Sequence, residues 1–174
     1  MTKFLDAKNA GDSYYTPQWC YENLPIDWSE YKTSLDAAMG DGRLYLFLEE
    51  QGIKVDGRDP QWASETGDDE DFLNWDGKVD LIITNPPFSK AQQFVEHAIP
   101  RADTVIMLQR LNWMGSQKRH TFWKEHTPDA LYILSKRPSF NGKGTDNQDY
   151  AWYVWQNGKK RLAGLHWITE KKKK

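Results

Sequence analysis

Four consecutive residues, Asn85-Pro86-Pro87-Phe88, combine a side-chain amide, two prolines and an aromatic ring. An amine on a flat heteroaromatic ring is a poor nucleophile, because its lone pair is delocalised into the ring. Two acceptors aimed at its hydrogens, the Asn85 side-chain oxygen and the Pro86 carbonyl, would favour the charge that develops when the nitrogen attacks an electrophile. Phe88 would stack on the ring. The tetrapeptide therefore suits catalysis at such an amine, although the same residues also suit a simple turn.

The residues before this tetrapeptide predict where it lies. Residues 79–83 form a short apolar run rich in β-branched side chains, which is typical of a buried parallel strand. The two prolines end the strand, because proline has no N–H to donate to a neighbouring strand. Open α/β sheets bind ligands at the carboxyl ends of their strands. We therefore expect the tetrapeptide at a ligand-binding edge of a sheet.

Asn85-Pro86-Pro87-Phe88 resembles the catalytic motif of S-adenosylmethionine-dependent amino-methyltransferases, which is Asp, Asn or Ser, then Pro-Pro, then an aromatic residue. That family methylates adenine N6, cytosine N4 or, occasionally, a glutamine amide. From about Tyr14 to Trp155 the chain is similar to short phage-encoded DNA N6-adenine methyltransferases. The resemblance implies S-adenosylmethionine as cofactor, DNA as partner, and a target adenine that leaves the base stack.

A candidate cofactor loop precedes the tetrapeptide in the chain. Residues 34–42 place a short strand before Gly40 and Gly42, and an apolar helical run follows. Glycine lets the backbone approach a ligand closely and adopt positive φ. The family pattern is an acidic residue, often proline, two variable residues and Gly-x-Gly. Asp36, Gly40 and Gly42 match it, while Ala37 stands where proline is common.

Further residues could contact the cofactor. Asp59 follows a strand expected at 53–59, at the distance from the glycine loop where Rossmann-like folds place a carboxylate on ribose, unless it is simply a surface aspartate. Pro60 and Trp62 would then flank the adenine. The resemblance implies that Tyr15, Thr16 and Pro17 line the methionine end, and that Asp71, Phe72 and Asn85 also contact the cofactor. As an alternative, Thr16 caps a helix that starts at Pro17, runs to about Leu24 and only covers the sheet.

Cationic and aromatic residues near the same sheet edge are candidates for nucleic-acid contact. The loop at 137–145 carries two glycines, a phenylalanine and cations, and could close over DNA or the flipped base; a solvated mobile loop is the alternative. We expect phosphate contacts from Arg110, Arg119, Arg137 and Lys143, and stacking from Trp113 and Phe140.

Alternating strand and helix patterns predict an α/β fold: a doubly wound, mainly parallel sheet of the Rossmann-like class I methyltransferase type with an antiparallel C-terminal edge. Further strands are expected at 103–109, 131–134 and 150–155, and helices at 43–51, at 90–99 with Ser89 as cap, and at 116–126. Asn157-Gly158 is a hairpin signal that would join 150–155 to an antiparallel strand at 162–168.

Length and composition bound the function. A chain of 174 residues favours one domain without a separate target-recognition domain, flexible at about 1–13 and 170–174, and hence a short or relaxed recognition sequence. A net charge of −2 restricts any nucleic-acid surface to a local patch. No apolar run is long enough to span a membrane. A single cysteine, Cys20, excludes an internal disulfide and a cysteine-based zinc site and fits a reducing cytoplasm. The resemblance implies the cytoplasm of a bacterial or phage-infected cell, and no metal is expected.

Three alternatives to adenine in DNA remain at this point. Cytosine N4 presents a similar amine, and the tetrapeptide alone does not separate the two bases. RNA or a protein glutamine amide could be the methyl acceptor. The chain could also be a catalytically silent module that binds the cofactor or DNA, against which the intact Asn85–Phe88 tetrapeptide argues.

Overall fold

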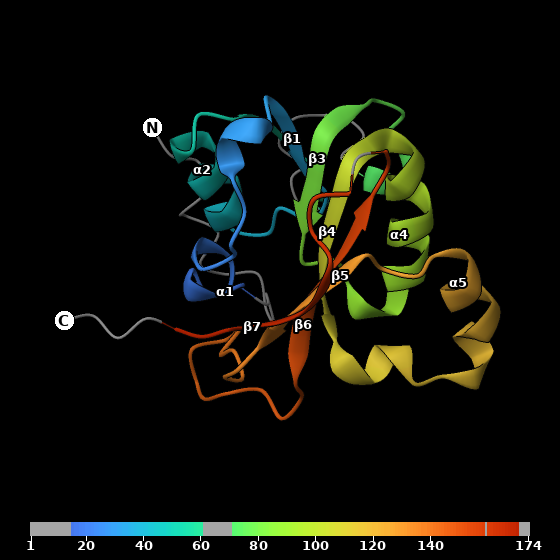
Figure 1. Cartoon of the computed structure of the whole chain (residues 1–174). Coiled ribbons are helices and arrows are strands. Elements are labelled where there is room, and N and C mark those ends of the chain that lie inside the picture. The colour runs from blue at the N-terminus through green and yellow to red at the C-terminus, as the bar shows by residue number, and fades with distance from the viewer. Residues whose placement is uncertain (1–14, 61–70, 159, 171–174) are drawn as a thin grey trace.

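The computed structural model describes residues 15–60, 71–158 and 160–170, and within them seven strands form one sheet (Figure 1). The strands are β1 Thr33–Asp36, β2 Lys54–Gly57, β3 Val79–Thr84, β4 Ala102–Arg110, β5 Ala130–Leu134, β6 Tyr150–Gln156 and β7 Gly164–Ile168. The α-helices are α1 Trp19–Glu22, α2 Arg43–Glu50, α4 Ala91–Ala98 and α5 His120–Glu125. Short 3₁₀ helices are η2 Trp28–Glu30, η3 Phe72–Asn74, η4 Phe88–Lys90, η5 Ile99–Arg101, η6 Leu111–Met114 and η7 Gln117–Arg119.

The sheet has the order β2-β1-β3-β4-β6-β5-β7 and is mainly parallel. β1 pairs in parallel with β2 and β3, and β3 pairs in parallel with β4. β6 is antiparallel to both of its neighbours, β4 and β5. The prediction of a doubly wound Rossmann-like sheet with antiparallel pairing at its C-terminal side is confirmed.

The hairpin predicted at Asn157-Gly158 was wrong. β7 does not pair with β6 but lies in parallel beside β5, with Ala130 opposite Gly164. The Gln156 side chain holds the chain after β6, because its Oε1 accepts from the backbone N–H groups of Arg161 (2.9 Å) and Leu162 (3.1 Å). These bonds occupy backbone groups that a tight hairpin would have paired with β6.

Apolar side chains alternate between the two faces of the sheet, so the core has two layers. Leu81 and Ile83 of β3 face one layer with α1 and α2, whereas Ile82 faces the other with α4 and α5. On β6, Trp152 faces the layer with α1 and α2, and Tyr153 faces the layer with α4 and α5. Figure 1 shows α1 and α2 on one side of the sheet and α4 and α5 on the other. The alternation is the period of two that pleated strands impose.

The strand order reverses between β1 and β3. From β1 the chain runs outward to β2, and it then returns to add β3 and β4 on the other side of β1. At such a switch point the loops after the two strands diverge to opposite faces, which leaves a crevice at their carboxyl ends. Asp36 ends β1 and Asn85 follows β3, so both lie at this edge.

Two predicted helix starts are corrected. Ser89 caps no helix, because the Pro87 carbonyl accepts from the N–H of Lys90 at 2.9 Å and closes η4, and α4 begins only at Ala91. Neither Thr16 nor Pro17 begins α1, which starts at Trp19. The segment predicted as one helix at 116–126 is divided into η7 and α5. Within the described ranges, every helix is too short or too polar to cross a lipid bilayer.

Replacement of Trp152 by phenylalanine should destabilise the protein. Trp152 is fully buried, and its Nε1 donates to the Cys20 carbonyl at 2.7 Å. The change removes this donor and some core volume, which should lower the free energy of unfolding in urea by about 2–4 kcal/mol. Trp167→Phe is the control, because Trp167 on β7 is 65% exposed, and its effect should stay within about 0.5 kcal/mol. Equal effects of the two changes would contradict the packing described.

Candidate active site

A buried carboxylate joins the ends of β1 and β3. Asp36 is 1% exposed, and its Oδ1 accepts from the Thr84 hydroxyl at 2.9 Å and from the Ala38 N–H at 3.4 Å. Burial raises the pKa of Asp36 to about 7, and the two hydrogen bonds oppose part of that rise. Asp36 is therefore the residue that fixes the first turn of the loop after β1 against the end of β3.

The loop after β1 has the backbone geometry of a ligand-approach loop. Gly40 and Gly42 have φ values of 55° and 78°, in the left-handed region that favours glycine. The N–H of Gly40 donates to Asp59 Oδ2 at 2.8 Å, and Asp59 itself is only 7% exposed. Asp59 thus holds the glycine loop directly, a contact that the sequence reasoning did not foresee. Ala37 is buried and adds packing rather than a polar group.

The amide of Asn85 is fixed by a residue far away in the sequence. Its Nδ2 donates to the Thr16 hydroxyl at 3.0 Å, which brings the 15–17 segment to the tetrapeptide. Asn85 Oδ1 is buried and, within the described residues, accepts no hydrogen bond. An acceptor left in this state costs about 1–3 kcal/mol. A donor on a bound molecule would remove that cost.

An aromatic and cationic group surrounds Phe88. The Arg110 guanidinium lies 4.5 Å from the centre of the Phe88 ring, and the Tyr150 ring centre is 5.7 Å away. Tyr150 also packs edge-on against Phe140, at 5.0 Å between ring centres. The N–H of Tyr15 donates to the Phe140 carbonyl at 3.0 Å. The 15–17 segment, the tetrapeptide and the loop at 137–145 therefore meet at one edge of the sheet.

The other residues of the predicted cofactor set differ in their surroundings. Phe72 is 1% exposed and packs against Phe94 and His97 in the core. Asp71 caps η3, where its Oδ1 accepts from the Leu73 N–H at 3.0 Å. Pro60 is exposed after β2, and Trp62 lies outside the described residues. Tyr15 and Pro17 are half-buried, with the Arg43 guanidinium 5.5 Å from the Tyr15 ring centre.

The predicted nucleic-acid residues divide into two groups. The two aromatic residues, Trp113 and Phe140, are buried, at 6% and 3% exposed. Trp113 is enclosed by Phe122, Trp123 and Tyr153. The four cations are accessible to differing degrees: Arg110 and Arg119 line a hollow beside Phe88, Arg137 forms an exposed ion pair with Asp149, and Lys143 is exposed.

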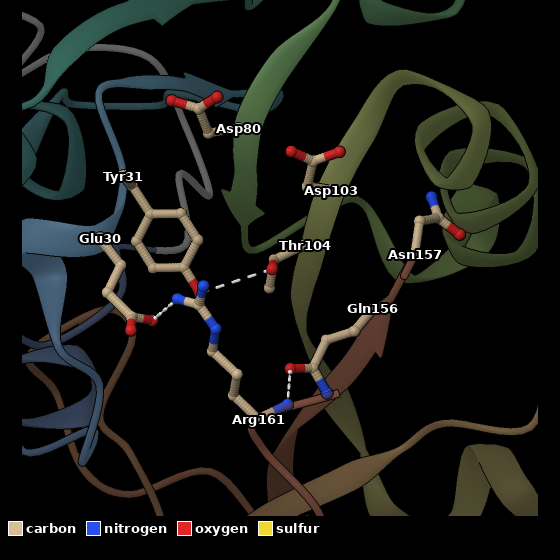
Figure 2. A pocket seen from close by; sticks show the side chains of 8 residues that line it. All are labelled: Glu30, Tyr31, Asp80, Asp103, Thr104, Gln156, Asn157 and Arg161. Atoms are coloured by element: carbon tan, nitrogen blue, oxygen red, sulfur yellow. Dashed lines mark hydrogen bonds and ion pairs between the residues drawn. The ribbon is translucent and has the colours of Figure 1, made fainter. Parts of the chain in front are cut away.

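A second hollow lies at the amino edge of the sheet, where several of the polar side chains that line it pair with neighbouring groups (Figure 2). Arg161 pairs with Glu30, and the Tyr31 hydroxyl donates to Thr104 at 3.4 Å. Asp80 Oδ2 accepts from the backbone N–H groups of Lys32 and Thr33 at the start of β1, each at 2.8 Å. The polar groups here therefore hold strand ends together, in contrast with the unpaired Asn85 oxygen at the carboxyl edge.

Comparisons with known proteins support the fold and find a distant relative by sequence. No protein-family model matches the chain. The chain is 28% identical, over 101 residues, to the Type II methyltransferase M.MgeORF184P of Mycoplasma genitalium, a match to 53% of this chain and 31% of that protein. The chain thus spans about a third of the length of the curated relative that it matches.

Solved structures of methyltransferases share the architecture. A candidate RNA methyltransferase from Pyrococcus horikoshii superposes with a TM-score of 0.61 at 19% identity, covering 82% of this chain and 86% of that chain. The 23S rRNA methyltransferase ErmE gives 0.53 at 17% identity, covering 76% and 64%. A candidate class I S-adenosylmethionine-dependent methyltransferase from Listeria monocytogenes gives 0.52 at 12% identity, covering 79% and 58%. The fold is that of class I methyltransferases.

Stability should respond to pH through Asp36. Between about pH 4 and pH 7 the folded protein keeps a proton on Asp36 that the unfolded chain has released, so this group lowers stability as pH rises through that window. Asp36→Asn cannot ionise but can still accept from Thr84. The unfolding free energy of the variant minus that of the wild type should increase with pH across the window, by up to about 4 kcal/mol. A difference in urea denaturation that stays constant with pH would contradict the raised pKa.

Proposed function

We propose that the protein transfers a methyl group from S-adenosylmethionine to the N6 amine of adenine in DNA. The observation that carries the proposal is the buried Asn85 Oδ1, which accepts no hydrogen bond within the described residues and lies in the tetrapeptide beside Phe88. The class I methyltransferase fold and the weak similarity to a Type II methyltransferase support it.

The carboxyl edge fits the proposed cofactor. Asp36, Gly40 and Asp59 gather after β1 and β2, and the positive φ of Gly40 gives close backbone approach without a side chain. Asn85, directly after β3, and Thr16 are joined by a hydrogen bond at the same edge. When bound there, S-adenosylmethionine supplies an electrophilic methyl group, whose bond to sulfur breaks as the bond to the amine nitrogen forms.

The residues of the tetrapeptide would act by positioning. Asn85 Oδ1 and the Pro86 carbonyl accept one hydrogen each from the target amine and stabilise the positive charge that grows on its nitrogen, after which one proton leaves. Thr16 keeps the Asn85 amide in the orientation that aims Oδ1 at the amine, since it occupies Nδ2. Phe88 stacks on the base. Cys20 takes no part, because burial raises the pKa of its thiol far above the ordinary value.

Cytosine N4 and an amine in RNA are alternative acceptors. Cytosine N4 carries the same two hydrogens for the same two acceptors. RNA is a second candidate because solved structures with this fold include the 23S rRNA methyltransferase ErmE. The cations that line the hollow beside Phe88 favour either nucleic acid over a protein glutamine.

Methyl transfer from radiolabelled S-adenosylmethionine tests the proposal. Unmethylated DNA, total RNA and a protein extract are each incubated with the enzyme, and the nucleic acids are digested to nucleosides. Label in N6-methyladenine from DNA is the expected result. Label in N4-methylcytosine would change the base, and label only in RNA or protein would change the substrate. An absence of transfer to all three would refute the enzymatic function and favour a silent binding module.

Asn85→Ala should lose methyl transfer while it keeps the cofactor site. Removal of the acceptor should lower kcat by about 10²–10³, as for the loss of other preorganised groups that stabilise transition-state charge. Binding of S-adenosylhomocysteine, measured by calorimetry, should change little. Asn147→Ala, an exposed asparagine in the loop before β6, is the matched control and should keep full activity. Normal turnover by Asn85→Ala would remove Asn85 from the mechanism.

Thr16→Val should lower kcat with little change in KM. Valine has nearly the shape of threonine but cannot accept from Asn85 Nδ2, so the amide loses its fixed orientation. Thr16→Ser keeps a hydroxyl and should restore most of the activity. Equal kinetics of the valine and serine variants would show that the hydrogen bond does not position Asn85.

A further inference from the structure

A hollow at the carboxyl end of β4 lies next to the tetrapeptide. It measures about 320 Å³ and is lined by Phe88, Gln109, Arg110, Trp113, Ser116 and Arg119, among others. We call it the Gln109 pocket. Phe88 forms one wall of it, so whatever occupies the pocket lies beside the ring on which the target base would stack.

Gln109 is the residue that sequence reasoning missed. It stands near the end of β4, is 1% exposed, and its Nε2 donates to no acceptor within the described residues. A buried amide donor in this state costs about 1–3 kcal/mol. Gln109 differs in this respect from Gln156 on β6, whose Nε2 donates to the Leu162 carbonyl at 2.7 Å. The unpaired donor indicates that the pocket accepts a group that is rich in acceptors.

The charge of the pocket points to an anion. Two guanidinium groups line it, and none of the described residues that border it is acidic. Arg110 is held over Phe88, with its Nε 3.4 Å from the Tyr150 hydroxyl, and Arg119 is held by a bond from Nη1 to the Trp113 carbonyl at 3.2 Å. Each guanidinium carries five N–H donors, so both retain donors after these contacts. Placed beside a base-stacking ring, an anion of this kind is a phosphate of the same nucleic-acid strand.

We propose that the Gln109 pocket binds a phosphodiester group adjoining the target nucleotide. Gln109 Nε2 donates to one phosphate oxygen, and Arg110 and Arg119 neutralise the charge. This assignment rests on the proposed function for its substrate, a nucleic-acid strand with one base at Phe88. The assignment makes Gln109 a positioning residue. Gln109 would fix the sugar-phosphate backbone so that the base reaches Asn85, and it would make no base-specific contact.

Binding of a fluorescein-labelled 20-nucleotide strand, as DNA and as RNA, tests this without methyl transfer. Anisotropy is measured with S-adenosylhomocysteine present over a range of salt concentrations. Arg119→Gln should reduce the slope of log K against log salt by about 0.7, the value for one phosphate contact on a single strand. Arg119→Lys keeps the charge and should keep the slope. Lys78→Gln removes the same charge from an exposed position at the amino edge and serves as the matched control, with the wild-type slope expected.

Gln109 variants test the amide itself. Gln109→Leu should weaken binding by roughly tenfold, and Gln109→Glu, of nearly equal shape, should weaken it further because a carboxylate repels phosphate. Each variant's urea midpoint is measured, so that a loss of folding is recognised. A slope unchanged in Arg119→Gln, or Gln109 variants that fold and bind as the wild type does, would overturn the proposal.

Neutral substitutions in the nucleic acid test the pocket in the wild-type protein as well as in Arg119→Gln. In an oligonucleotide that the enzyme methylates, neutral methylphosphonates replace the phosphates one at a time. One position next to the target should raise KM about tenfold in the wild type and much less in Arg119→Gln. If no single position matters, the pocket does not hold a phosphodiester. Binding with the expected salt slopes but no methyl transfer to any acceptor would refute the proposed function and leave the anion pocket standing.

Discussion

The hydrogen bond from the Thr84 hydroxyl to the buried carboxyl of Asp36 joins the two strands at which the sheet reverses its order. Two segments of the candidate site begin next to this hydrogen bond. The glycine loop starts directly after Asp36, and Asn85 directly follows Thr84. Asp36 is buried, and burial disfavours the ionised form of a carboxyl group. The pKa of Asp36 is raised for that reason. The protein thus places a buried carboxyl group, whose ionised form is disfavoured, beside the candidate active site.

The polar groups at the two edges of the sheet are satisfied to different extents. At the amino edge, Asp80, Arg161 and Gln156 pair with backbone and side chains of neighbouring segments. At the carboxyl edge, Asn85 Oδ1 and Gln109 Nε2 are buried and unpaired within the described residues. Folding alone would favour the removal of such groups, because an apolar side chain of similar size avoids the penalty of an unmade hydrogen bond. Their presence is best explained by a ligand that supplies one donor and one acceptor.

These two amides also divide the tasks at the proposed acceptor site. Asn85 follows β3 and would face the proposed amine, whereas Gln109 lies near the end of β4, two strands from β1 in the sheet. Phe88 connects the two amides, because it belongs to the same tetrapeptide as Asn85 and its ring borders the Gln109 pocket. Base, backbone and cofactor would thus each be held by a different strand end. Rigid strands rather than a flexible loop would therefore set their relative positions.

Sequence patterns by themselves determined the local features. The apolar run of β3, its termination at two prolines and the Gly-x-Gly turn each depend on neighbouring residues, so the fold class, the glycine loop and the place of the tetrapeptide were predictable. The starts of helices were harder to predict from the sequence. After the tetrapeptide, for example, the Pro87 carbonyl rather than the Ser89 side chain accepts the hydrogen bond that closes the turn.

Contacts between distant segments were decided only by the tertiary structure. Thr16 meets Asn85 across 69 positions, and Asp59 binds the glycine loop across 19. The burial of Phe72, Trp113 and Phe140 likewise depends on what other elements pack against them, since an aromatic residue in the sequence suits a core as well as a surface. The same holds for Gln109, whose unpaired amide becomes informative only when its surroundings are known. Periodicity reports which face a side chain is on, whereas only packing reports what that face meets.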